Sequence, residues 1–382
     1  MNHRSRLLTA LRRRQPDRVP FDMRFTLAAR AAFVLHTGAA DPAEFIDADY
    51  RFAPVPTPPQ LPDFSAYFRG RVPDWPKGGW TDWAPRLVET STPPYPHFFR
   101  LGPQTALNEW GEYRIYDAEW NYHRKVYPLD APDCTPEQIL DFPFPDVWAD
   151  SRYAGLAEAI AAIHERGLAA LLFLEMTVFE KAWRIRGFEN LLADFILRPE
   201  TAECLLDAVA VRTGHIAARY AAAGVDIIRL GDDIGAERSL LVRPAMWRRF
   251  LKPRLAAVIA AARKAKPDVL IFYHSDGEIE AVIPDLIEVG VDILNPIQPE
   301  TLDVARLKRD FGDRLAFWGG IGVQTTLPFG TPGDVRAAVR RLITDAGAGG
   351  GLLVAPSHVV EPDVPWENIF ALVEAVREYG AY

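Results

Sequence analysis

The chain has 382 residues, of which 49% are hydrophobic and 25% charged, and its formal net charge is −8 at pH 7. These proportions are typical of a globular protein and exclude a disordered, collagen-like or coiled-coil chain. An acidic chain lacks the basic face that binds nucleic-acid phosphates, and no window of this sequence holds the ~18 apolar residues of a membrane helix.

The N-terminal stretch is rich in arginine, but no apolar core of a secretory signal follows it. Leu7, Leu8 and Leu11 recur at helical spacing and predict a short surface helix with a solvated basic side. The two cysteines, Cys134 and Cys204, form neither a metal-binding nor a disulfide pattern, which suits a reducing compartment. We therefore expect a cytoplasmic protein.

The first expected strand covers residues 18–25. Residues 51–150 then hold 17 of the 32 prolines and six of the ten tryptophans. Because proline disrupts helices, we expect an irregular excursion over the mouth of the fold, not an independent domain. The tryptophans should mainly anchor irregular backbone, although an aromatic-lined lid would suit a flat apolar substrate. They are Trp75, Trp80, Trp83, Trp110, Trp120 and Trp148.

From residue 150 onward, short apolar segments alternate with longer segments of helical periodicity. One helix is expected to begin at Pro199 and end at Gly224, and another to begin with Thr331 as its N-cap. This alternation predicts crossover units and a parallel sheet. The expected strands are 168–174, 225–230, 269–273, 291–295, 315–318 and 352–355.

Two α/β architectures fit this pattern: a (β/α)8 TIM barrel and an open doubly wound sheet. A doubly wound nucleotide binder carries a glycine-rich turn directly after its first strand, and this chain has none. The glycine-rich segment Gly347–Gly351 precedes a strand and is typical of a helix-ending turn. We therefore predict one TIM-barrel domain over residues 1–382, with an eighth strand within residues 80–130.

In a parallel barrel the carboxyl ends of all strands meet at one mouth, which carries the chemistry. Polar or glycine residues follow strand after strand in the predicted barrel, so we expect them to converge. They are Glu175, Asp232, Asp233, His274, Asp276, Asn295, Gln298, Gly319, Gly320, Ser357 and His358. We assign substrate binding to Glu175, Asn295, Gln298 and Gly320.

His274 and Asp276 leave a strand two residues apart, so both side chains could bind the same ion. His358 leaves the last strand and could join them over the barrel axis. Alternatively, His274 is a hydrogen-bonded residue at a strand end and Asp276 an N-cap near Glu278. A single His-x-Asp pair does not decide between these interpretations.

Asp232 and Asp233 are candidate catalytic carboxylates for acid–base chemistry. The alternative is a salt-bridged or N-capping pair, and only one of two adjacent side chains should face the mouth. Glu175 with one of these aspartates would also suit a glycosidase. The sequence contains no GxSxG, HExxH or Walker motif, which argues against serine hydrolases, zincin proteases and P-loop enzymes.

Several motifs, in this order, resemble the uroporphyrinogen decarboxylase superfamily over nearly the whole chain, most densely across residues 225–380. They are Arg18–Pro20, Gly231–Gly235, Arg243-Pro244, His274–Gly277, Gly290–Gln298, Gly319–Ile321, Ala355–His358 and Pro365–Asn368. The resemblance implies a (β/α)8 barrel. It also implies one of two activities, because the superfamily contains tetrapyrrole decarboxylases and zinc-dependent methyltransferases that serve corrinoid proteins.

The decarboxylases resemble one another in a Met-Arg-Gln-Ala-Gly-Arg stretch whose arginines bind substrate carboxylates. Here Met23-Arg24 matches, which implies substrate binding by Arg24, but Phe-Thr-Leu-Ala follows. The methyltransferases bind zinc through His-x-Cys and a later Cys. His274 matches this histidine, while Asp276 and His358 take the two cysteine positions. Such nitrogen and oxygen ligands are harder than thiolates but still bind a divalent metal.

The resemblance therefore implies a metal-dependent methyltransferase or demethylase with a small-molecule substrate, a corrinoid protein as partner and zinc as the first candidate metal. One alternative is a decarboxylase of uroporphyrinogen or of another acid, for which no metal is expected; the resemblance then implies that Asp232 or Asp233, with His358, stabilises a protonated pyrrole during catalysis. The other alternative is a non-catalytic tetrapyrrole- or corrinoid-binding protein. A homodimer is compatible with each of these. Neither a nucleic acid nor a membrane is expected as a partner.

Overall fold

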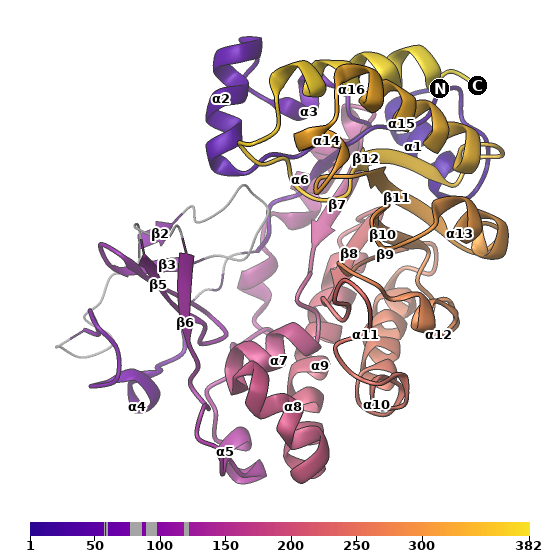
Figure 1. The fold of residues 1–382 in the computed structure, drawn as a ribbon. Helices are drawn as coiled ribbons and strands as arrows, with labels where there is room; N and C mark the ends of the chain where they lie inside the picture. The colour runs from indigo at the N-terminus through magenta and orange to yellow at the C-terminus, as the bar shows by residue number, and fades with distance from the viewer. Residues whose placement is uncertain (57, 59, 77–85, 89–97, 118–121) are drawn as a thin grey trace.

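Figure 1 shows the computed structural model of the chain. It describes all residues except 57, 59, 77–85, 89–97 and 118–121. A curled sheet of seven parallel strands forms its centre, in the order β1-β7-β8-β9-β10-β11-β12. These strands are β1 (Tyr50–Phe52), β7 (Ala169–Phe173), β8 (Ile227–Gly231), β9 (Leu270–His274), β10 (Ile293–Ile297), β11 (Ala316–Ile321) and β12 (Leu352–Pro356). The last six confirm the strands predicted after residue 150.

The eighth position of the barrel is held by the N-terminal segment 20–25, next to β12. Phe21 pairs with Val354 in a parallel bridge, and the Val354 N–H donates to the Pro20 carbonyl at 3.0 Å. The segment predicted as the first strand, residues 18–25, therefore takes a strand position, but it forms isolated bridges and not a continuous strand. The eighth strand predicted within residues 80–130 was wrong, because the described strands of that region pair with one another and not with the barrel.

Helices cover the outside of the barrel, and their ends follow the capping signals in the sequence. The helix α9 (Pro199–Ala222) begins with a proline in its first turn and is followed by Gly224 at φ +96°. Thr331 and Asp334 form a capping box at the start of α15 (Pro332–Ala346). The other outer helices include α6 (Leu156–Glu165), α8 (Phe188–Leu197), α11 (Lys252–Ala265), α12 (Ile283–Val289), α13 (Val304–Phe311) and α16 (Trp366–Tyr379).

Shorter or peripheral helices complete the described part of the chain. They are α1 (His3–Leu11), α2 (Leu27–Thr37), α3 (Pro42–Phe45), α4 (Ser65–Phe68), α5 (Pro136–Leu140), η2 (Asp150–Tyr153), α7 (Phe179–Arg186), α10 (Pro244–Phe250), η3 (Glu280–Val282) and α14 (Thr326–Phe329). Among the described residues, no helix combines the length and the apolar character needed to cross a membrane.

The inside of the barrel is filled with side chains and closed at one end. Trp318 of β11 packs its ring against Tyr50 at 5.3 Å and against Phe272 at 5.2 Å between ring centroids. Leu7 and Leu11 of α1 are fully buried in this same cluster. Because α1 contacts β1, β7, β11 and β12, it closes the amino end of the barrel. The carboxyl end, where active sites of this architecture lie, stays open.

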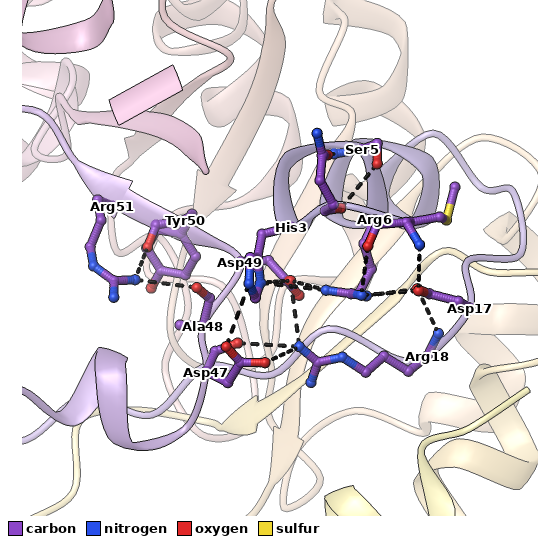
Figure 2. A network of polar contacts seen from close by, with 12 residues as sticks. His3, Ser5, Arg6, Asp17, Arg18, Asp47, Ala48, Asp49, Tyr50 and Arg51 are labelled. Carbon is purple, nitrogen blue, oxygen red and sulfur yellow. Dashed lines mark hydrogen bonds and ion pairs between the residues drawn. The ribbon is translucent and has the colours of Figure 1, made fainter. Parts of the chain in front are cut away.

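The polar side of α1 is less solvated than its arginine content suggests (Figure 2). The helix itself was predicted correctly, but Arg6 is only 8% exposed. Its guanidinium donates to Asp17 at 2.7 Å and to the buried Asp49 at 2.8 Å, and His3 contacts the same Asp49 carboxylate. These ion pairs fasten α1 to the segment that leads into β1.

Residues 51–150 are more regular than predicted. They contain a second, antiparallel sheet that lies beside the barrel in Figure 1. Its strands are β2 (Arg86–Val88), β3 (Phe98–Gly102), β4 (Thr105–Asn108), β5 (Tyr113–Asp117) and β6 (Tyr122–Val126). The described helices of this region are short, as its prolines predict. Whether the region acts as a lid stays a prediction.

Part of this region is anchored to α7, which follows β7 at the carboxyl end of the barrel. Arg184 donates to the buried Glu112 carboxylate at 2.6 Å, and the Lys181 Nζ lies 4.6 Å from the centre of the Trp110 ring. Trp75 and Trp110 are buried, as expected of anchors, whereas Trp148 is 47% exposed. The other three predicted anchors, Trp80, Trp83 and Trp120, lie outside the described residues.

Candidate metal centre

A cavity opens at the carboxyl ends of the barrel strands. Six residues that the sequence singled out line it, namely Arg24, Glu175, His274, Asn295, Ser357 and His358. They come from the segment beside β12, from the ends of β9, β10 and β12, and from the loop after β7. The prediction that strand ends gather polar side chains around one space therefore holds for these residues.

His274, the last residue of β9, has a side chain that is only 11% exposed and has a fixed orientation. Its Nδ1 lies 2.7 Å from the Asn295 Oδ1. The Asn295 amide nitrogen donates to the Trp318 carbonyl at 2.9 Å, so its oxygen must face the imidazole. His274 therefore donates through Nδ1–H, and in the neutral ring its Nε2 carries the lone pair that can bind a metal.

The Nε2 of His274 faces the acidic side of the cavity mouth. It lies 3.9 Å from the Asp276 Oδ1, and the other oxygen of Asp276 lies 3.9 Å from the His358 Nε2. One ligand atom from each of these three residues falls within 4.8 Å of the others. The structure thus brings together the set predicted from the sequence.

The electrostatics at this point favour a cation. Burial disfavours the charged form of His274, but the carboxylates of Glu175, Asp276 and Asp233 outweigh burial and raise its pKa. For His358, burial is the largest effect and lowers the pKa, which keeps the imidazole neutral. A lone pair that faces carboxylates is repelled unless a proton or a metal ion lies between them. The donor set and its charge therefore fit a divalent metal.

Asp232 and Asp233 point in different directions, as adjacent residues that leave a strand should. The Asp232 carboxylate accepts hydrogen bonds from the N–H groups of Val178 at 3.1 Å and Glu180 at 2.9 Å, at the start of α7. Burial and the nearby Glu180 raise the pKa of Asp232 to about 7. Asp233 instead turns toward the candidate centre, with its Oδ1 3.8 Å from the His274 Nε2.

Close packing of β8 against β9 positions these aspartates. Gly231 precedes them, and a Cβ at this glycine would lie 2.4 Å from the His274 carbonyl oxygen. Only a glycine allows this approach. The Gly-Asp-Asp sequence therefore brings Asp233 close to the end of β9.

Two other predicted substrate-binding residues are not among those that line the described cavity. The Gln298 Oε1 accepts the Gly277 N–H at 3.2 Å, and so supports the loop that carries Asp276. Gly320 has φ +96°, and a Cβ there would lie 2.6 Å from the Leu342 side chain of α15. These contacts are structural, and a role in substrate binding stays a prediction for both residues.

Two buried charged residues of the cavity were missed in the sequence. Arg229 of β8 forms an ion pair with Glu175 and lies over the Phe272 ring at 4.5 Å. Asp22, beside Arg24 in sequence, accepts a hydrogen bond from the Trp318 indole N–H at 3.2 Å. The available signal was an arginine inside the otherwise apolar run Ile227–Leu230, because a charge in a buried strand needs a partner.

These features define a TIM-barrel protein with a candidate metal centre at the carboxyl end of its strands. Residues 127–379 match the family described as Uroporphyrinogen decarboxylase (URO-D), a match that covers more than half of the chain. The chain therefore belongs to the URO-D family, and the resemblance noted in its motifs is confirmed.

The individual relatives include both methyltransferases and decarboxylases. The chain is 30% identical over 159 residues to the Methylcobamide:CoM methyltransferase MtaA of Methanosarcina barkeri. It is 27% identical over 164 residues to a Uroporphyrinogen decarboxylase of Coxiella burnetii. The matches cover 42% and 41% of this chain, and 43% and 42% of the relatives, so the chain spans less than half the length of either.

The fold also agrees with a solved structure. A methyltransferase from Methanosarcina mazei superposes with a TM-score of 0.63 over 99% of both chains, at 18% sequence identity. This likeness shows that the two proteins share a fold, and it confirms the predicted barrel.

Proposed function

We propose that the chain is a metal-dependent methyltransferase or demethylase of the URO-D family, which passes a methyl group between a small-molecule substrate and a corrinoid protein. The observation that carries this proposal is the group of His274, Asp276 and His358, with ligand atoms within 4.8 Å of one another. The name of the Methanosarcina barkeri relative includes methylcobamide as a reactant, which supports a corrinoid protein as the partner.

The ligand set indicates the kind of metal. Two imidazole nitrogens and a carboxylate oxygen suit zinc and other first-row divalent ions, whereas thiolates would select softer ions. Neither cysteine belongs to the group: Cys134 is buried, and the Cys204 thiol contacts the Pro136 carbonyl. Zinc is therefore the first candidate.

When bound, a divalent ion would supply Lewis acidity, which polarises the oxygen of a methyl ether or activates a thiol acceptor. The residues around the proposed metal position orient its ligand His274 and line the space beside it. Asn295 holds the His274 ring, so that Nε2 keeps its direction. The Glu175–Arg229 ion pair keeps a fixed carboxylate near His274 inside the barrel. Arg24 lines the same cavity and can bind an anionic group of the substrate.

One observation favours a second candidate, a decarboxylase of uroporphyrinogen or of another acid. Arg24 lies at the cavity, where a substrate carboxylate would meet its guanidinium. In this reaction His358 and one of the aspartates, Asp232 or Asp233, would stabilise a protonated pyrrole. Here the metal would have no role, so metal content separates the two candidates.

Metal analysis and two assays test these proposals. Elemental analysis of the purified protein should find about one divalent ion per chain, and less than about 0.2 would contradict the methyltransferase proposal, because a preformed site retains its ion. His274→Ala should abolish this binding. Methyl transfer to cob(I)alamin from methyl ethers, followed by absorbance, should need the metal. Loss of carboxyl groups from uroporphyrinogen without metal would favour the decarboxylase.

A further inference from the structure

Asp233 is as close to His274 as the predicted ligand Asp276 is. Its Oδ1 lies 3.8 Å from the His274 Nε2, compared with 3.9 Å for the Asp276 Oδ1. The two carboxylates reach this nitrogen from different strands, since Asp233 follows β8 and Asp276 follows β9. Asp233 therefore belongs to the immediate surroundings of the lone pair that would bind the metal.

These separations suit ligands of one ion. Ligand atoms about 2.0–2.1 Å from a tetrahedral metal lie about 3.3–3.4 Å from one another. The contacts of His274 with Asp233, of His274 with Asp276 and of Asp276 with His358 measure 3.8, 3.9 and 3.9 Å. The two Asp276 contacts are made by different oxygens, and one ligand atom from each of His274, Asp276 and His358 lies within 4.8 Å of the others. Side-chain rotations of about an ångström would bring these atoms to one ion.

The charge balance also favours a second carboxylate. Two neutral imidazoles and the single carboxylate of Asp276 would leave one net positive charge on a divalent ion, and a second carboxylate cancels it. His274 is almost completely enclosed in the protein, where an uncompensated charge is costly. Among the described residues, Asp233 is within ion-pair distance of His274 alone, whereas Glu175 is already paired with Arg229.

The backbone of Asp233 is held in place, whereas its carboxylate can move. The Glu180 carboxylate accepts the Asp233 N–H at 3.3 Å, which ties the backbone to α7. The Asp276 N–H donates to the Asp233 Oδ1 at 3.0 Å. The side chain is 43% exposed, so the carboxylate can move away from the metal position and exchange this contact for water.

We propose that Asp233 is a fourth, exchangeable protein ligand of the metal, which leaves when the substrate or the methyl acceptor needs its position. This inference rests on the proposed function, because it requires a metal at His274, Asp276 and His358. It assigns to Asp233 a role in metal binding in addition to the catalytic role predicted from the sequence.

Cobalt substitution tests the proposal without an activity assay. The purified protein is stripped of metal and loaded with Co²⁺ alone, and its visible d–d absorption is recorded for the natural sequence and for Asp233→Ala. We expect the spectrum to change and the Co²⁺ affinity, measured by competition with a chromophoric chelator, to fall at least tenfold. Asp363→Asn, a change of charge at an exposed loop residue five positions after His358, is the matched control and should alter neither.

Asp233→Asn guards against a folding defect in the alanine variant, because its amide oxygen can still accept the Asp276 N–H; it should show the same two changes. An unchanged d–d spectrum would overturn the proposal even if the affinity fell, since a lost charge weakens cation binding without any change of ligand. If the natural sequence bound no Co²⁺ at all, the proposed function itself would fail, together with this inference.

Discussion

The His274 Nδ1 lies 2.7 Å from the Asn295 Oδ1, and this contact decides which nitrogen of the imidazole faces Asp276. Asn295 is itself fixed by its hydrogen bond to the Trp318 carbonyl, within the packed interior of the barrel. The orientation of the candidate ligand is therefore set by the neighbouring strands β10 and β11. A partner of this kind is as important to a metal site as the ligands themselves.

Asn295→Ala should weaken metal binding by about 10- to 100-fold, because the His274 ring loses the acceptor that fixes its tautomer. The measurement is competition between the protein and a chromophoric chelator. Gln324→Ala removes an exposed side-chain amide elsewhere and should leave the metal affinity unchanged. Equal affinities for the two variants would show that Asn295 does not orient the ligand.

Removal of the metal should be reversible in the natural sequence. Dialysis against a strong chelator is expected to lower methyl transfer at least 100-fold, and one equivalent of zinc should restore it, because the fold holds the three ligands close together. His358→Ala should retain neither metal nor activity after the same treatment. Full activity in the chelated protein would contradict the metal-dependent reaction.

Glu112→Gln should destabilise the fold by about 1–3 kcal/mol at pH 7, because Arg114 loses its buried ion-pair partner and Arg184 keeps only Glu180. Burial raises the pKa of Glu112, but these arginines outweigh it and lower the pKa to about 2. A carboxylate with a lowered folded-state pKa stabilises the protein above its unfolded value, 4.5. The contribution is then lost as the pH falls toward about 2.

Urea unfolding of Glu112→Gln and of the natural sequence at several pH values measures this contribution. The difference in free energy of unfolding should be constant above pH ~4.5 and shrink at lower pH. A difference that grew on acidification would contradict the assignment.

Leu11→Ala should lower the free energy of unfolding by about 2–5 kcal/mol, because Leu11 is fully buried where α1 closes the barrel. The matched control is Leu35→Ala in α2, whose side chain is 86% exposed, and its effect should stay within about 0.5 kcal/mol. Urea denaturation measures both. Similar effects of the two substitutions would mean that α1 does not seal the barrel in solution.

The sequence predicted the barrel and the three candidate ligands for one physical reason. The side chains of His274, Asp276 and His358 lie at or just after the carboxyl ends of strands that must meet, so strand periodicity predicts that they converge. Their role as metal ligands was implied by the resemblance to the methyltransferases. The interior partners could not be predicted in this way. Arg229 and Glu175 pair across neighbouring strands, and such a pair depends on strand register, which a single sequence does not specify.

The regions predicted incorrectly have weak local signals. The strand β1 has three residues, too few to show an alternating pattern. In β4, four consecutive buried residues likewise show no alternation, and the surrounding prolines suggested irregular structure instead of a second sheet. The solvated face predicted for α1 failed at Arg6, because its partners Asp17 and Asp49 are distant in sequence.

The two chain ends meet at the closed end of the barrel, where Arg18 bridges Ala381 and the Val19 N–H donates to the Gly380 carbonyl at 2.7 Å. The first helix also contacts β12, more than 300 residues later in the chain. During synthesis residues 18–25 can therefore complete the barrel only after β12 and residues 380–381 have been made. Contacts of such large sequence separation are slow to form, so barrel closure should be a late folding event.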